Sequence, residues 1–131
     1  ANSSSQISAE QPHIFIIEDD NIMAECLARA CQDMRCTIFH DAISAMATLG
    51  DNLPDLILLD VLLSGPDGFT FLNELISYPD TAAIPVILVT SLTLNTTNLA
   101  HYGVRAILFK ETMTPQEILS TVRGILYPER K

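Results

Sequence analysis

Four short, unbroken apolar runs constrain the fold of this chain more than any other feature of its sequence. Each has the length of a β-strand and is rich in branched residues, without the polar alternation of a strand that has one wet face. Such runs suit a parallel sheet that is covered by helices on both faces. They are IFII (14–17), LILL (56–59), VILV (86–89) and AILF (106–109), and a weaker run with a polar residue, CTIF (36–39), is predicted as an edge strand.

Amphipathic helical patterns separate these runs. Residues that favour helix starts precede three of them: Asp41 and Asp67 are predicted N-caps, and Thr114 opens a capping box with Glu117. Gly50 is the predicted end of the second helix. Apolar residues at helical spacing are Met23, Leu27, Ala30, Cys31 and Met34; Ala42, Ala45, Met46 and Leu49; Phe71, Leu72, Leu75 and Ile76; and Ile118, Val122 and Ile125.

One connection has a weaker pattern. The segment between Thr90 and Gly103 must return the chain between two parallel strands, so a helix is expected there. Its threonines and asparagines are poor helix formers, and we therefore predict a short or irregular helix.

Five strands that alternate with helices predict an α/β fold, a doubly wound, flavodoxin-like three-layer sandwich. Right-handed crossovers favour a five-stranded parallel sheet with the strand order 2-1-3-4-5. The 131 residues suit one domain, predicted over residues 13–128. Residues 1–12 are interpreted as a polar, disordered tail without the hydrophobic segment of a signal peptide.

Polar residues stand where the predicted strands end. Carboxyl ends of parallel strands meet at one edge of a sheet, and ligands of such folds bind there, between strands 1 and 3. Any one of these residues alone has an ordinary explanation: an acidic trio can cap a helix, and a lysine is usually a surface residue. Asp60 is harder to explain, because apolar residues flank it on both sides. The strand-end residues are Glu18, Asp19, Asp20, Asp60, Thr90 and Lys110.

Their combination indicates phosphoryl chemistry. Carboxylates crowded at one edge repel unless a cation is present, and oxygen ligands with open water positions suit Mg²⁺. A carboxylate such as Asp60 can act as a nucleophile and become an aspartyl phosphate. Lys110 and the Thr90 hydroxyl would then hold phosphoryl oxygens, and catalysis would rest on positioning and charge neutralisation.

At this point the chain resembles the receiver domain of two-component response regulators, over nearly everything from residue 13 to about residue 128. The resemblance is carried by IIEDD at the first strand, LLDVLLSGPDGF at the third, IPVILVTS at the fourth and AILFK at the fifth. It departs from the usual pattern at Ser64, where a proline is common, at Ile107, where an aromatic switch residue is usual, and at Glu111, where a proline often follows the lysine.

The resemblance implies a role for each matched residue. Asp60 is the phosphoacceptor, with Thr90 and Lys110 as catalytic partners. The Mg²⁺ ligands are Glu18, Asp19, Asp60 and the backbone carbonyl of Leu62, and Asp20 is an extra neighbour. The domain would catalyse its own phosphorylation and dephosphorylation, without independent enzymatic turnover.

The resemblance also implies partners. The donor would be a sensor histidine kinase or a histidine phosphotransfer protein, and an output domain or downstream protein would bind through residues 91–126. Two alternatives remain: a receiver-like interaction module that works without phosphorylation, and a different enzyme on a similar sheet. A haloacid-dehalogenase-type phosphatase would need an aspartate where Leu62 stands, and nucleotide-binding folds would need absent glycines.

The net charge limits the classes of binding partner, and the cysteines indicate the redox environment of the chain. The net charge of −9 argues against direct binding of nucleic acid or an anionic membrane, and is compatible with a divalent cation or a basic partner surface. Cys26, Cys31 and Cys36 match no zinc spacing. Because Cys26 and Cys31 fall on the predicted apolar stripe of a helix, we interpret the cysteines as small buried hydrophobes in a reducing cytoplasm.

Overall fold

The computed structural model describes residues 11–60, 68–91 and 102–127. Within these ranges five strands and five helices follow one another along the chain. In order they are β1 (His13–Ile17), α2 (Asn21–Ala30), β2 (Arg35–Phe39), α3 (Ala42–Leu49), β3 (Leu56–Asp60), α4 (Gly68–Ile76), α5 (Pro79–Ala82), β4 (Val86–Thr90), β5 (Val104–Phe109) and α6 (Pro115–Leu126).

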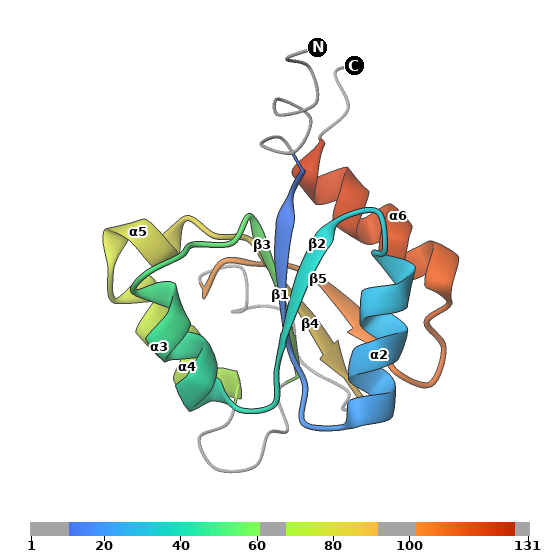
Figure 1. Cartoon of the computed structure of the whole chain (residues 1–131), viewed down its shortest axis with the longest axis horizontal. Coiled ribbons are helices and arrows are strands. Elements are labelled where there is room, and N and C mark those ends of the chain that lie inside the picture. Colours follow the sequence, from blue (N-terminus) through green and yellow to red (C-terminus); the bar gives the residue numbers. More distant parts are fainter. Residues whose placement is uncertain (1–10, 61–67, 92–101, 128–131) are drawn as a thin grey trace.

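The strands form one parallel sheet in the order β2-β1-β3-β4-β5. This is the predicted order, with β2 at the edge as expected. Helices α2 and α6 cover one face, while α3, α4 and α5 lie on the other (Figure 1). The predicted α/β three-layer sandwich is therefore confirmed, and all strands end at the same edge of the sheet, at the bottom of Figure 1.

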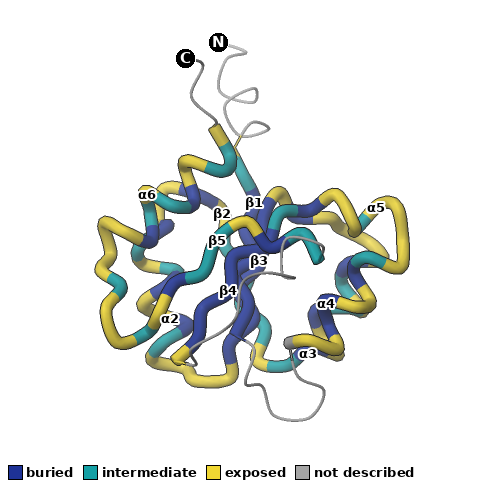
Figure 2. Tube along the Cα trace, turned by 180° about the vertical axis from the view of Figure 1, so that it is seen from behind, coloured by how far each residue is buried: buried dark blue, intermediate teal, exposed yellow. Residues whose placement is uncertain are grey.

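Two apolar cores flank the sheet, because successive side chains of a strand point to opposite faces. Phe15, Ile57 and Leu88 pack with α3 and α4, whereas Ile14, Leu58 and Ile87 pack with α2 and α6. The central strands are buried on both sides and the exposed residues lie on the outer helix surfaces (Figure 2). This double burial is why the strand sequences are continuously apolar.

The predicted helix starts are confirmed wherever the structure describes them. The Asp41 side chain accepts a hydrogen bond from Ser44 N at 2.7 Å, and Thr114 Oγ1 accepts one from Glu117 N at 3.0 Å. Gly50 is the C-cap of α3. The apolar spacing predicted a first helix that reaches Met34, but α2 ends at Ala30. Met34 is nevertheless buried, and it lies beyond the turn that follows the helix.

Helix α5, a single turn that opens at Pro79, corresponds to no predicted element. Other predictions fall on residues outside the described ranges: residues 1–10 of the disordered tail predicted over residues 1–12, the cap at Asp67, the carbonyl of Leu62 and the irregular helix after Thr90. No helix of the described part of the chain is long and apolar enough to cross a bilayer.

The prediction that all three cysteines are buried was wrong for Cys26. Cys31 is buried and Cys36 is partly buried, but Cys26 is exposed. Five residues advance a helix by about 140° beyond a full turn, so Cys26 and the C-cap residue Cys31 lie on different sides of the α2 axis. Burial raises the pKa of Cys31 to about 12 and that of Cys36 to about 11.

These environments predict selective alkylation of the folded protein. At about pH 8, iodoacetamide is expected to label Cys26 alone, because a thiol needs access and its thiolate form to react. Mass spectrometry should show one adduct in buffer and three in urea. The Cys26→Ser variant is the control, and should lose the fast adduct. Equal labelling rates for the buried and exposed cysteines would contradict these environments.

Candidate functional site

Three consecutive acidic residues follow β1, and the structure gives them different places. Glu18 is completely buried, and its backbone N–H donates to Phe39 O at 2.9 Å, which fixes the chain beside β2. Asp19 and Asp20 are exposed. Asp20 is the N-cap of α2, where its Oδ1 accepts a hydrogen bond from Ile22 N at 3.1 Å. The trio therefore combines a helix cap with two carboxylates that are available to a site.

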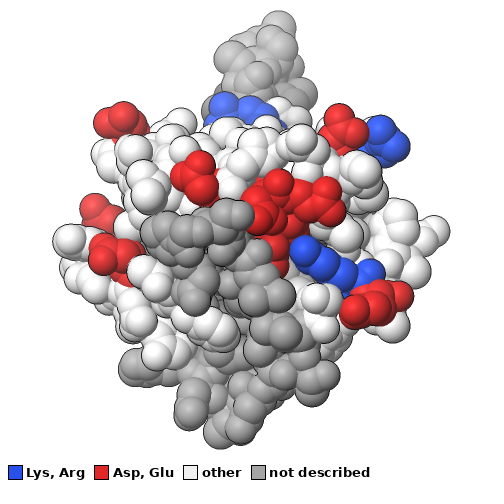
Figure 3. Space-filling view, turned by 90° about the horizontal axis from the view of Figure 1, so that it is seen from below, with Lys and Arg blue, Asp and Glu red and all other residues white. Residues whose placement is uncertain are grey.

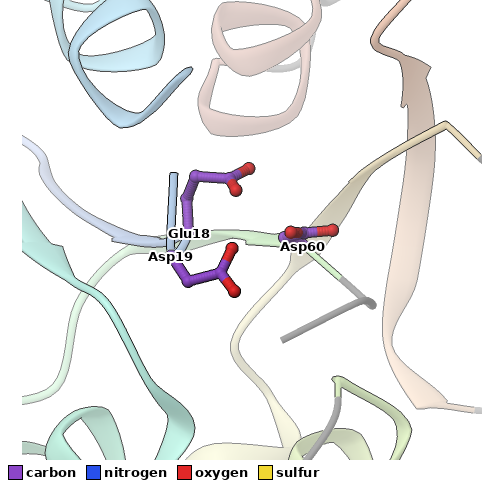
Figure 4. Close-up of side chains that lie close together, drawn as sticks. All are labelled: Glu18, Asp19 and Asp60. Carbon is purple, nitrogen blue, oxygen red and sulfur yellow. The ribbon is translucent and has the colours of Figure 1, made fainter. Parts of the chain in front are cut away.

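Asp60 is the last residue of β3, the strand that pairs with β1, and is only 3% exposed. Glu18, Asp19 and Asp60 each offer a carboxylate oxygen, and these oxygens lie within 4.8 Å of one another. Figure 4 shows the three side chains gathered at the ends of β1 and β3. Acidic side chains also cluster on this edge of the surface, next to a basic side chain (Figure 3).

Lys110 provides the positive charge of this cluster. Its Nζ lies 3.1 Å from Glu18 Oε1 and 3.4 Å from Asp60 Oδ2, so one ammonium bridges two buried carboxylates. The backbone N–H of Lys110 donates to Thr90 O at 2.9 Å, which ties the start of the β5–α6 connection to the end of β4. Thr90 itself is fully buried at that strand end.

Burial controls the electrostatics of the site. The pKa of Glu18 is raised to about 7, chiefly because burial desolvates the carboxylate; the Asp60 charge adds to the rise, while the hydrogen bond and charge of Lys110 oppose it. For Lys110, burial alone would lower the pKa, but Glu18 and Asp60 outweigh it and raise the pKa above its ordinary value. The cluster thus holds more negative charge than its lysine neutralises.

The family comparison decides what kind of domain carries this cluster. The response regulator receiver domain family matches residues 14–123. The chain belongs to the response regulator receiver domain family. It is the receiver domain of a two-component signalling protein, and such domains generally partner with histidine kinases.

Relatives and solved structures support this assignment. Response regulator PleD from Caulobacter vibrioides is 48% identical over 52 residues, which cover 40% of this chain but only 12% of PleD. The receiver domain also matches a response regulator structure from Chloroflexus aurantiacus, with a TM-score of 0.80, 27% identity, and coverage of 89% of this chain and 98% of that one. A phosphorylated cyanobacterial phytochrome response regulator, RcpA, matches with a TM-score of 0.71, 26% identity, and coverage of 88% and 91%.

Receiver domains bind a divalent metal, and the carboxylates of this one fit that requirement. A hard divalent cation prefers oxygen ligands, of which Glu18, Asp19 and Asp60 supply three within 4.8 Å. Glu18 Oε1 is buried, and its contact within the described residues is with the Lys110 ammonium, 3.1 Å away. A buried carboxylate oxygen in this state favours a further cation in the same space.

Most predicted site residues therefore lie together. The carboxyl edge of the sheet holds Glu18, Asp19, Asp60 and Lys110. Thr90 lies at the end of β4, the strand next to β3. Leu62 lies outside the described residues. The sequence did not reveal that Lys110 bridges Glu18 and Asp60, since the bridge depends on how far β5 extends beside β4. It also did not reveal that His40 Nδ1 lies 3.0 Å from the Glu18 carbonyl oxygen.

Proposed function

We propose that this receiver domain accepts a phosphoryl group on the Asp60 carboxylate from a histidine kinase or a histidine phosphotransfer protein. One observation carries the proposal: a nearly buried carboxylate at a strand end lies beside two further carboxylates and a lysine. The resemblance to phosphorylated RcpA agrees with such a role. A purely structural function would not require this concentration of like charges, which costs stability.

The transfer would join one Asp60 carboxylate oxygen to phosphorus while the bond from phosphorus to the donor imidazole nitrogen breaks. The imidazole leaves with the bonding electron pair and takes up a proton. Asp60 needs no general base, since a carboxylate is already ionised as the nucleophile. The receiver domain thus mainly aligns the reacting groups and compensates the charge on the phosphoryl oxygens.

The proposed ligands of a Mg²⁺ ion are Glu18, Asp19, Asp60 and the Leu62 carbonyl. When bound, the ion would supply positive charge that offsets the phosphoryl and carboxylate oxygens. Asp19 is the exposed member of the group, so it is the ligand that water and an entering ion meet first. Glu18 is buried beside Lys110, which positions it to complete the site from inside.

Lys110 and Thr90 would respond to the new phosphoryl group. Lys110 already contacts Asp60, so it can exchange its Glu18 contact for a phosphoryl oxygen with a small movement. Thr90 can offer its hydroxyl as a hydrogen-bond donor. Because the Lys110 backbone bonds to Thr90 O, movement at either residue changes the ends of β4 and β5 together.

The output would be a changed binding surface within residues 91–126, which includes β5 and α6. A downstream protein or an output domain would bind there, with the protein acting in the cytoplasm. The proposed domain spans residues 13–128. Gln11 Nε2 donates to Asp33 O at 3.2 Å and Pro12 O accepts from Arg35 N at 2.9 Å, so the folded contacts begin slightly before that boundary.

The direct test is incubation with a small phosphodonor such as acetyl phosphate in the presence of Mg²⁺. Intact-mass spectrometry should show a gain of one phosphoryl group, and excess EDTA should suppress it. A known receiver domain labelled in parallel shows that the conditions work. If that control gains mass and this chain does not, the domain is instead an interaction module that works without phosphorylation.

Substitution of Asp19 tests the metal site separately. The Asp19→Asn variant is expected to bind Mg²⁺ at least roughly tenfold more weakly, because it removes a charged oxygen ligand. Calorimetric titration is suitable, since the chain has no tryptophan to report binding. The matched control is Asp20→Asn, which removes the neighbouring charge but keeps a good N-cap on α2. An equal loss in both variants would contradict direct ligation by Asp19.

A further inference from the structure

The outer surface of α3 carries a groove with an apolar lining, on the sheet face opposite α2 and α6. Two hollows of about 450 Å³ and 290 Å³ share Met46 as a lining residue. We call their combined surface the α3 groove. Its apolar lining includes Ile43, Met46, Leu49, Leu53, Phe71 and Tyr78.

Three of these apolar side chains are largely exposed. Ile43 is 65% exposed, Tyr78 57% and Leu53 45%. Single exposed apolar residues are common on protein surfaces. Here they line adjoining hollows instead of being scattered, so that one bound segment can contact them together.

The polar rim of the groove is acidic. Asp51 and Asp80 line the larger hollow, Glu74 lines the smaller one, and all three are exposed. The sequence contains no Lys or Arg between Arg35 and Arg105, a stretch that includes α3, α4 and α5.

The larger hollow of the α3 groove is separate from the phosphoacceptor site. This hollow includes Gly50 and Leu53, which precede β3 at the amino edge of the sheet, whereas Asp60 ends β3 at the carboxyl edge. Five strand residues separate the two edges by roughly 15 Å. Asp51 and Asp80, which line this hollow, therefore serve neither the metal site nor Asp60.

We propose that the α3 groove binds a basic, amphipathic segment of a partner protein. Apolar side chains of that segment would enter the hollows around Met46, and flanking Lys or Arg would meet Asp51, Glu74 and Asp80. The eight residues of α3 span about 12 Å, which matches about two turns of a partner helix with apolar residues at i, i+4 and i+7. Binding at this groove is independent of the proposed phosphorylation.

Charge complementarity favours this occupant over others. A second copy that used the same face would place acidic rims against each other, which is unfavourable in a two-fold contact. Nucleic acid and anionic lipid would also be repelled. A basic segment gains attraction from the rim, while the apolar hollows supply contacts that a merely soluble acidic surface would not need.

The test uses a synthetic peptide of about 14 residues, long enough for nearly four helical turns. It carries Leu at i, i+4 and i+7 with Lys at the remaining positions, and a second peptide replaces each Lys with Glu. Titration into the ¹⁵N-labelled protein is followed by NMR. Only the Lys peptide is expected to shift amide signals, with the largest shifts in α3, residues 50–53 and residues 78–81.

Variants then separate the groove from general electrostatic attraction. Ile43→Ser and the double variant Asp51→Asn/Asp80→Asn are each expected to weaken binding of the Lys peptide roughly tenfold, since apolar anchors and rim charges act together. The matched control is Ile22→Ser/Glu25→Gln on α2, where Ile22 is 76% exposed and Glu25 is also exposed. It should leave the affinity within about twofold, the scale of an ordinary surface change.

Other results would overturn the proposal. They are shifts centred on Glu18, Asp19 and Asp60 instead of α3, equal losses in the groove and control variants, or no binding of the Lys peptide. Self-association that Ile43→Ser abolishes would assign the groove to a second copy of the chain. Comparing Asp60→Asn with the wild type distinguishes the two proposals, because that variant should keep its affinity for the peptide.

Discussion

The Asp60→Asn variant is expected to gain no phosphoryl group under conditions that fully label the wild type. Asparagine preserves the size of the side chain and its position at the end of β3. Its neutral amide lacks the ionised oxygen that attacks phosphorus, so the loss should be complete instead of partial. Intact-mass spectrometry after incubation with acetyl phosphate and Mg²⁺ measures the effect.

Two comparisons make this result specific. Asp51→Asn removes an exposed carboxylate from the opposite edge of the sheet and should label like the wild type. Circular dichroism should show that Asp60→Asn remains folded, because the substitution also removes one charge from a crowded cluster. An equal mass gain in Asp60→Asn and the wild type would exclude Asp60 as the acceptor. Peptide mapping would then identify the carboxylate that replaces it.

The sheet was predictable from sequence because local and global requirements agree there. The central strands are buried on both faces, and their sequences are accordingly continuous apolar runs. Helix caps such as Asp41 and Thr114 are equally local, since each side chain bonds to an amide three residues away. Placing Glu18, Asp60 and Lys110 at one edge needed only the parallel topology.

Other features depend on distances and directions that sequence patterns do not encode. The burial of Cys26 was predicted wrongly because the cysteines were treated alike as apolar residues. The rotation of the helix between Cys26 and Cys31 turns Cys26 towards the solvent. The short α5 follows Tyr78, an N-cap without a side-chain capping bond, so it lacks the signal that marks longer helices. The simultaneous contact of Lys110 with two carboxylates could not be predicted, because it depends on the path of β5 beside β4.

The contact of Lys110 with both carboxylates explains how the folded domain tolerates these buried charges before an ion or a phosphoryl group binds. Glu18 and Asp60 are both almost completely buried, and burial raises the pKa of Glu18 to about 7. Lys110 supplies compensation from inside the fold, at the cost of its own partial desolvation. The same lysine therefore has a structural task in addition to its proposed contact with the phosphoryl group.

Removal of Lys110 should accordingly destabilise the domain. In Lys110→Ala, the free energy of unfolding near pH 8 is expected to fall by about 2 kcal/mol or more in EDTA, because two buried carboxylates lose their cation. Urea unfolding followed by circular dichroism measures the change. The matched control is Arg123→Ala, which breaks the 2.7 Å pair with Asp33 between side chains that are 55% and 46% exposed. That loss should stay below about 1 kcal/mol, as is usual for surface ion pairs.

The pH dependence distinguishes lost charge compensation from lost packing. Because the pKa of Glu18 is raised from 4.5 to about 7 on folding, the folded state holds the extra proton between these values, and this group's contribution to stability falls as pH rises through that window. Without Lys110 the pKa should rise further, so the difference from wild type should be larger near pH 8 than near pH 5. Added Mg²⁺ should recover part of the loss at the higher pH, since it returns positive charge to the same carboxylates. A destabilisation that is equal at both pH values and insensitive to Mg²⁺ would mean that Lys110 acts through the packing of its alkyl chain.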